Sequence, residues 1–344
     1  MKATFSWRGL FLKGLIGTIA FALVNVFVYR TSDYFAELRA YRSAVDLLLA
    51  KPDVTQVLVG DSHVARLRAN LLHDSVYNLA TGGDGLRECY AKLRYLFEHD
   101  TRVNTVYLSL DYHMFGAGRL RSANGAFADW YLLRSFSAHG FEKGWLSALM
   151  NIVPLFNDDY AQYMRTKFGA VLKRSAGIRM PPPKPVWFLL SEEERISRAH
   201  RTGLSDHVQL DEFDEPYLWI ERIVALTRAH NVRLIGVRYP AHPAYASAAT
   251  PDRMERIHDR VAQLGVQDVR DFRSTFSRPE CFTDADHLSP AGALVLARML
   301  EVPVRTGVTG WAWALDERHP KAPVEPARCM DQLPPPPPTS SVSR

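Results

Sequence analysis

The chain has 344 residues, of which 47% are apolar, 23% charged and 11% aromatic; this is the composition of a globular protein and excludes a disordered or fibrous one. Three cysteines exclude a scaffold built on disulfides, and no Cys-x-x-Cys pair or Cys/His cluster predicts structural zinc. The 42 basic and 37 acidic residues give a net charge of only +5, and the basic residues are scattered, so we expect no nucleic-acid partner.

An apolar segment over residues 10–29 is the first informative feature of the chain. It reads LFLKGLIGTIAFALVNVFVY and is about as long as a helix that crosses a bilayer, roughly 20 residues. Lys2, Arg8 and Lys13 lie at its N-terminal end, which predicts that residues 1–9 stay in the cytoplasm and that the following domain is periplasmic. Because no A-x-A cleavage site follows, we expect an uncleaved anchor in the inner membrane; a cleaved signal peptide and a buried core helix are the alternatives.

Strand and helix patterns alternate between the anchor and residue 300. Short β-branched runs predict strands over residues 54–59, 76–79, 103–110, 232–237 and, at the edge of the sheet, 266–272. Apolar residues at helical spacing predict helices over residues 63–72, 86–97, 217–229, 252–264 and 290–300. This alternation is typical of an α/β fold with a doubly wound parallel sheet of about five strands, which binds ligands at the carboxyl ends of its strands.

Two segments of the predicted extracytoplasmic domain and its tail depart from this alternation. Residues 112–216 are rich in aromatic side chains, and Ser191 to Glu194 has the spacing of a capping box. We expect a mainly helical insertion there, either as core or as a lid over the strand ends. Residues 322–344 include five consecutive prolines, which favour an extended conformation, so we expect a disordered tail after a domain over residues 30–321.

A Gly60-Asp61-Ser62 motif stands where the first predicted strand turns into a helix. A serine at this place has its hydroxyl exposed above the sheet, and the free backbone N–H groups of the following helix can stabilise a nearby negative charge. Gly60 allows a tight approach of the chain. The same three residues are also common in loops and at helix N-caps, so alone they do not establish catalysis.

The second motif is the segment DADHLSPAG over residues 284–292, just before the last predicted helix. An acid three residues ahead of a histidine on a loop can reach back to the imidazole. This is the pair that a serine nucleophile needs, with His287 as the base and Asp284 to fix its tautomer. Alone, the loop could equally cap the helix at Pro290 or bind a cation. In a doubly wound sheet both motifs can lie at the same edge.

Together the two motifs resemble those of the SGNH, or GDSL, hydrolase superfamily, over residues 54–115 and 216–300. The resemblance implies a flavodoxin-like three-layer fold, with Ser62 as nucleophile, His287 as general base and Asp284 as its orienting acid. It also implies an oxyanion hole formed by the backbone N–H groups of Ser62 and Gly83, with Gly82 as the alternative to Gly83.

One block of the family pattern is missing from this chain. Where the family has an asparagine that completes the oxyanion hole, the chain reads Ser109-Leu-Asp111-Tyr-His113. Loss of one donor costs roughly 3–4 kcal/mol of transition-state stabilisation unless another group replaces it. Asp111 and His113 are therefore candidate substrate or oxyanion contacts. His242 is a third candidate, because it follows the fourth predicted strand; a turn residue is the alternative.

These roles predict a serine esterase or O-acyltransferase that uses a Ser-His-Asp triad and no cofactor. A single anchor before an extracytoplasmic domain is also similar to envelope O-acetylation and D-alanyl-transfer proteins. That similarity implies acyl esters of an envelope or exported polysaccharide as substrate and a multi-pass membrane acyltransferase as partner. Two alternatives stay open: a catalytically degenerate protein that binds glycan, and an assembly factor that acts through the anchor and the tail.

Other polar residues near the motifs have structural interpretations. We expect His63 on the solvent side of its helix, and Asp286, one residue before His287, poorly placed to orient the imidazole. A metal site made of nearby acids and histidines lacks a familiar ligand spacing, so we expect none; the residues considered are Asp61, Asp111, His113 and His287.

The three cysteines indicate little on their own. Cys89 falls on the apolar face of its predicted helix and is expected to be a core residue. An oxidising compartment would permit one disulfide among Cys89, Cys281 and Cys329, and the sequence leaves its pairing open.

Overall fold

The computed structural model describes residues 7–99, 101–120, 124–134, 153–175, 187–305 and 329. The predicted tail over residues 322–344 lies outside the described residues except for Cys329, as do residues 135–152 and 176–186 of the predicted insertion.

A five-stranded parallel sheet forms the centre of the domain, with the strand order β2-β1-β3-β4-β5 of a flavodoxin-like doubly wound fold. The strands are β1 (Gln56–Val59), β2 (Val76–Asn78), β3 (Thr105–Ser109), β4 (Arg233–Arg238) and β5 (Val269–Asp271). All five predicted strands are confirmed, and β5 lies at the predicted edge. The strand order reverses between β1 and β3, so the loops after these two strands lie where such sheets bind ligands.

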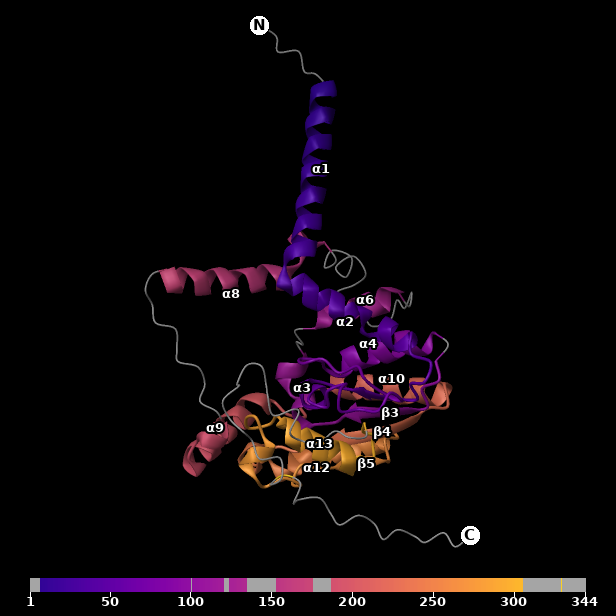
Figure 1. Ribbon diagram of the computed structural model, residues 1–344, viewed down its shortest axis with the longest axis vertical. Coiled ribbons are helices and arrows are strands. Elements are labelled where there is room, and N and C mark those ends of the chain that lie inside the picture. Colours follow the sequence, from indigo (N-terminus) through magenta and orange to yellow (C-terminus); the bar gives the residue numbers. More distant parts are fainter. Residues whose placement is uncertain are drawn as a thin grey trace.

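Helices cover both faces of the sheet, as the three-layer prediction requires. Val57 of β1 packs with α4 (Leu86–Phe97) and α10 (Glu215–Ala229), whereas the next residue, Leu58, packs on the other face with α13 (Pro290–Met299). This alternation follows from the period of two residues in a strand. Figure 1 shows α4 and α10 on one side of the strands and α13 on the other.

Four predicted helices are confirmed to within two residues, as α4, α10, α12 (Pro251–Gln263) and α13. The fifth prediction, over residues 63–72, is wrong in length, because α3 spans only Ser62–Ala65. The side-chain amide of Asn78 in β2 donates to the carbonyls of Val64 and Leu67, both at 2.8 Å. These two carbonyls would accept backbone N–H groups if the helix continued, so their hydrogen bonds to Asn78 favour its end at Ala65.

The described part of the insertion is helical, as predicted. Its elements are η1 (Tyr112–Phe115), α5 (Ala117–Leu120), α6 (Gly125–Arg134), η2 (Pro154–Phe156), α8 (Asp158–Ser175), η3 (Trp187–Leu189) and α9 (Glu192–Asp206). The predicted capping box begins α9, because the N–H of Glu194 donates to the Ser191 hydroxyl at 3.2 Å and the N–H of Ser191 donates to the Glu194 carboxylate at 3.1 Å.

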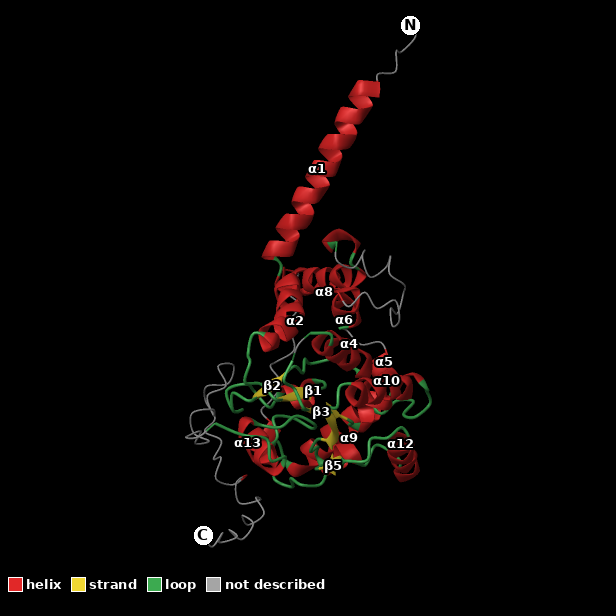
Figure 2. Cartoon of the chain, turned by 90° about the vertical axis from the view of Figure 1, so that its right-hand side faces the viewer, coloured by secondary structure: helices red, strands yellow, loops and turns green. Residues whose placement is uncertain are grey.

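The N-terminal apolar segment forms α1 (Trp7–Thr31), of which Phe11–Thr31 is long and apolar enough to cross a membrane. Only 6% of that apolar stretch is buried, so α1 is not a core helix of this domain. It leads into α2 (Asp33–Leu49), for which no element is predicted from the sequence. Figure 2 shows α2, α6 and α8 between α1 and the sheet, and the ring of Tyr34 in α2 packs 5.5 Å from that of Tyr163 in α8.

The disulfide joins Cys281 to Cys329, and Cys89 is a free, buried thiol on α4. The core position predicted for Cys89 is thereby confirmed, and the pairing that the sequence leaves open is assigned. The two cysteines are 48 residues apart in the sequence. Cys281 lies three residues before Asp284, so the bond attaches Cys329 close to the predicted acid. Such a cross-link stabilises a fold mainly by restricting the unfolded chain.

We expect reduction of this disulfide to lower the free energy of unfolding by about 2–4 kcal/mol and the melting temperature by about 3–6 °C. The measurement is thermal unfolding of the full chain in detergent, with and without dithiothreitol. The Cys329→Ser variant should melt at the lower temperature in both buffers. An equal response of both proteins to dithiothreitol would contradict the assignment.

Candidate active site

Ser62 is the first residue of α3, directly after β1, and its side chain is partly exposed. Gly60 makes the turn possible, because its φ is +152° and a Cβ there would lie 2.4 Å from Cγ2 of Val64 and 2.5 Å from Cβ of Ser109. Because α3 has only four residues, the long helix expected to stabilise a negative charge here is not present. An oxyanion at this place would depend on individual N–H groups.

His287 lies on the loop between β5 and α13, and the backbone holds this loop tightly. The N–H of Thr283 donates to the carbonyl of His287 at 2.8 Å. From the loop after β4, the N–H of His242 donates to the carbonyl of Ala285 at 2.9 Å. The loop is therefore fixed both within itself and to the end of the neighbouring strand.

The structure brings Ser62, His287 and Asp284 into one hydrogen-bonded row. The Ser62 Oγ lies 2.8 Å from Nε2 of His287, and Nδ1 of His287 lies 2.8 Å from Oδ1 of Asp284. The same carboxylate oxygen accepts the backbone N–H of His287 at 2.9 Å, so it fixes both the ring and its main chain. In this geometry the imidazole can accept the hydroxyl proton while the carboxylate holds its other nitrogen protonated.

The base of this row has a strongly shifted pKa. Burial alone would lower the pKa of His287, but hydrogen bonds to Asp284 and Asp286, together with the attraction of both carboxylates, raise it to about 9. In the free protein the imidazole is therefore mostly protonated at neutral pH, and the fraction that can act as a base increases as the pH approaches 9.

Asp286 is placed differently from the sequence prediction. Its Oδ1 lies 3.3 Å from Nδ1 of His287, and its Oδ2 lies 3.2 Å from Nε2 of His63. The prediction that Asp286 is poorly placed to orient the imidazole is therefore wrong. It fails because the loop turns back on itself between Asp284 and His287, which brings both carboxylates to the same ring nitrogen.

His63 is also placed differently: it is buried, with 4% of its surface exposed, and not on the solvent side of a helix. Its Nδ1 lies 2.7 Å from Oδ2 of Asp111, so each ring nitrogen faces a carboxylate. Burial lowers the pKa of His63, but Asp61, Asp111 and Asp286 outweigh this effect and raise the pKa well above its ordinary value. The sequence analysis missed the burial of His63, because the carboxylates that pair with it are distant in sequence.

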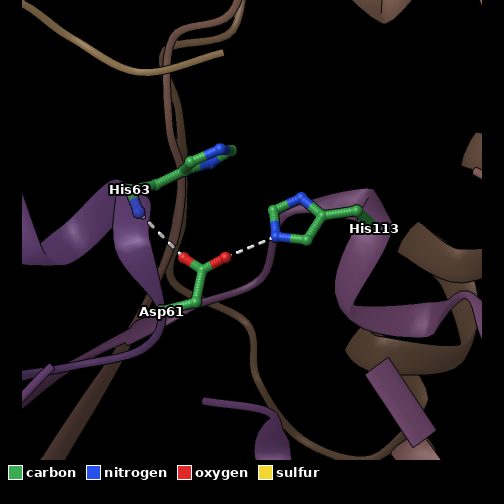
Figure 3. Close-up of side chains that lie close together, drawn as sticks. All are labelled: Asp61, His63 and His113. Atoms are coloured by element: carbon green, nitrogen blue, oxygen red, sulfur yellow. Dashed lines mark hydrogen bonds and ion pairs between the residues drawn. The ribbon is translucent and has the colours of Figure 1, made fainter. Parts of the chain in front are cut away.

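The buried ion pair of Asp61 with His113 lies beside the pair of His63 with Asp111. Figure 3 shows the Asp61 carboxylate between the backbone N–H of His63, at 3.1 Å, and Nε2 of His113, at 2.5 Å. Arg119 donates to Oδ2 of Asp61 at 2.8 Å. Burial would raise the pKa of Asp61, but His63, His113 and Arg119 hold it well below its ordinary value. Asp61 is thus a buried carboxylate with every oxygen paired.

The candidate contacts Asp111 and His113 are both buried in these pairs. Asp111 accepts the backbone N–H of Tyr239 at 2.6 Å and also contacts His63. His113 is hydrogen-bonded to Asp61. Their positions favour a structural role over contact with a substrate. His242, the third candidate, caps α11 (Pro243–Ala246), which agrees with the turn alternative.

The glycine turn predicted to complete the oxyanion hole lies against Ser62. A Cβ on Gly82 would stand 3.7 Å from Cβ of Ser62, whereas Gly83 adopts a φ of +89° and faces the amide of Asn124. Both glycines therefore remain candidates for the donor beside the Ser62 N–H.

Buried polar contacts hold this turn in place. The Asn124 amide donates to the Gly82 carbonyl at 3.0 Å and to Asp84 at 2.7 Å. Lys92, from α4, donates to Asp84 at 2.7 Å and to the carbonyl of Leu79 at 2.6 Å. Sequence reasoning missed Asn124 and Lys92, because a lysine on an amphipathic helix ordinarily points to solvent.

The acids and histidines behind Ser62 include a group whose geometry could suit a cation. Ligand atoms of Asp61, His63 and His113 lie within 4.8 Å of one another, close enough to hold a cation. The Asp61 carboxylate instead contacts His113 and Arg119, and the two ring nitrogens of His63 face Asp111 and Asp286. This arrangement disfavours a cation, and the absence of a metal stays a prediction.

No protein-family model matches the chain, and a search of curated proteins finds no similar sequence. The chemistry of the site is therefore inferred from its own geometry.

The close approach at Gly60 predicts that Gly60→Ala destabilises the protein by about 2–4 kcal/mol and displaces Ser62, because the added methyl overlaps Val64 and Ser109. Urea unfolding of the full chain measures the effect. Gly118→Ala in α5 is the matched control, since a Cβ there meets no atom within 4 Å. The control should be neutral or slightly stabilising. Equal stability of the two variants would contradict the steric argument.

Proposed function

We propose that this protein is a membrane-anchored, extracytoplasmic serine esterase or O-acyltransferase of the SGNH type that acts on acyl esters of an envelope or exported polysaccharide. The observation that carries the proposal is the row from Ser62 through His287 to Asp284, with 2.8 Å at each step, at the ligand-binding edge of a doubly wound sheet.

The reaction follows from these contacts. His287 Nε2 takes the proton of Ser62 as Oγ attacks the ester carbonyl carbon, and the imidazolium is stabilised through Nδ1 by the carboxylate. The tetrahedral oxyanion binds the N–H of Ser62 and that of the Gly82–Gly83 turn. Collapse breaks the bond to the alcohol, which leaves with the proton from His287. Water or a sugar hydroxyl then attacks the acyl-serine and gives its proton to His287. The bond between the acyl carbon and Ser62 Oγ breaks, Oγ takes that proton back from His287, and the acyl group leaves as acid or new ester.

Two features outside the site support the compartment and the anchor. The helix α1 is long and apolar enough to span a bilayer, and basic residues precede it in the sequence, which favours a cytoplasmic N-terminus. The disulfide Cys281–Cys329 is of a kind that persists in oxidising compartments such as the periplasm. Both support a domain outside the cytoplasm, where envelope polysaccharides and a multi-pass acyltransferase partner would be within reach.

The exposure of the triad supports a large substrate. The side chain of Asp284 is 48% exposed and that of His287 20%, so the row lies at an open surface. An ester on a flexible polymer could reach Ser62 there without entering a closed cavity.

We expect a fluorophosphonate to form one covalent adduct on the full chain in detergent, because the hydrogen bond to His287 activates the Ser62 hydroxyl. Intact-mass analysis detects the adduct. Ser62→Ala and His287→Ala should abolish it, and Ser289→Ala, which alters the N-cap of α13, serves as the matched serine control. A folded protein that forms no adduct would overturn the catalytic assignment and favour a glycan-binding protein.

The rate of adduct formation should increase with pH. With the pKa of His287 at about 9, the free base is the minor form at pH 7, so the rate constant should increase about tenfold per pH unit and level off above pH 9. Labelling rates between pH 6 and 10 test this expectation. A profile already flat at pH 7 would show that the two carboxylates do not hold the proton on His287.

A further inference from the structure

Asp286 lies between two imidazoles. One of its oxygens is 3.3 Å from Nδ1 of His287, and the other is 3.2 Å from Nε2 of His63. The two rings stand edge to face, with centroids 5.2 Å apart and planes at 87°. A carboxylate in this position interacts with the positive charge of either ring, and its direction is fixed from both sides.

Asp284 and Asp286 meet the same nitrogen of His287 in different surroundings. Asp284 is 48% exposed, and its Oδ1 is shared among Nδ1 of His287 and the backbone N–H groups of Asp286 and His287. Asp286 is 12% exposed. Water screens the charge of an exposed carboxylate more than that of a mostly buried one. Asp286 therefore acts strongly on the imidazolium although its Oδ1 lies 3.3 Å from Nδ1, against 2.8 Å for Asp284.

His63 connects Asp286 to the sheet. Its second nitrogen contacts Asp111 at 2.7 Å, and Asp111 accepts the N–H of Tyr239, the residue after β4, at 2.6 Å. An imidazole with a carboxylate on each nitrogen donates to both only as the imidazolium. A positively charged His63 therefore holds Asp286 in place from the side opposite His287.

Other charged and titratable groups also act on Asp286. The elements around it contribute Asp206 and His207 at the end of α9 and Tyr245 in α11, all within range of its charge. Asp206 accepts a hydrogen bond from the Tyr245 hydroxyl at 3.2 Å.

On the far side of His63 from Asp286 lie Asp61 and His113. Among the described groups around Asp286, the histidines His63 and His287 are the ones that contact its oxygens directly.

We propose that Asp286 is a second acid for the catalytic base, acting beside Asp284, and that His63 is the positioning residue that holds it there. The inference rests on the proposed function and extends it to two residues outside the Ser62–His287–Asp284 row. During attack by Ser62, the proton on Nδ1 stays on His287, and the negative charge of Asp286 stabilises the imidazolium that forms.

The experiment compares Asp286→Asn, Asp284→Asn and His63→Gln in the full chain in detergent. For each variant, fluorophosphonate labelling gives a rate constant on the high-pH plateau and a pH midpoint, and NMR of ring-labelled histidine gives the pKa of His287 directly. Asp74→Asn, which removes a surface carboxylate paired with Arg305, is the control for the change in net charge.

We expect Asp286→Asn to lower the plateau rate about tenfold to hundredfold, at least as much as Asp284→Asn, and to move the midpoint to lower pH. His63→Gln keeps hydrogen bonding but removes the positive charge near His287, so its midpoint should move to higher pH. Opposite shifts in the two variants are a signature that simple loosening of the fold would not produce.

A plateau and midpoint of Asp286→Asn equal to those of the wild type would overturn the proposal, as would shifts of Asp286→Asn and His63→Gln in the same direction. The NMR measurement separates this failure from failure of the proposed function. If the wild type does not label at all, the serine chemistry is wrong, yet the pKa of His287 in the variants still decides whether Asp286 and His63 act on it.

Discussion

The burial of three carboxylates at the end of the sheet constrains the rest of the site. Asp61 follows β1, Asp111 follows β3 and Asp286 lies in the last loop; the first two are buried, and the side chain of Asp286 is 12% exposed. A buried carboxylate costs several kcal/mol unless it is paired, so the contacts of these carboxylates with His63, His113 and Arg119 stabilise the loops. Because these loops carry Ser62 and His287, the charge pairing also fixes the distance between the serine hydroxyl and the imidazole.

The apolar core supplies the frame on which this pairing acts. Alternation of residues such as Val57 and Leu58 buries both faces of the sheet, which places the strand ends in one row with the polar loops that follow them. The close contact of Gly60 with the end of β3 then brings the loops after β1 and β3 together. The buried ion pair of Lys92 with Asp84 holds the Gly82–Gly83 turn on the other side of Ser62. Packing therefore positions the strands, and ion pairs position the loops.

The sequence predicts what depends on local pattern and misses what depends on distant partners. Strand and helix periods, the capping box at Ser191 and the i to i+3 relation of Asp284 and His287 are local, and the structure bears out their geometry. The burial of His63 could not be predicted, because its partners lie 48 and 223 residues away in the chain. The short length of α3 has the same cause, since the amide of Asn78 in β2 donates to the carbonyl of Val64 in α3 and to that of Leu67 just beyond it.

The position of the anchor relative to the site bears on the substrate. In Figures 1 and 2 the helices α2, α6 and α8 separate α1 from the sheet. If α1 spans the bilayer, the strand-end edge that carries Ser62 stands away from the membrane surface by the thickness of that helical layer. An acyl chain still embedded in lipid would have to leave the bilayer to reach Ser62, at the cost of exposing its apolar surface to water. An ester on a hydrated polysaccharide bears no such cost, and this difference favours the polymer as the substrate.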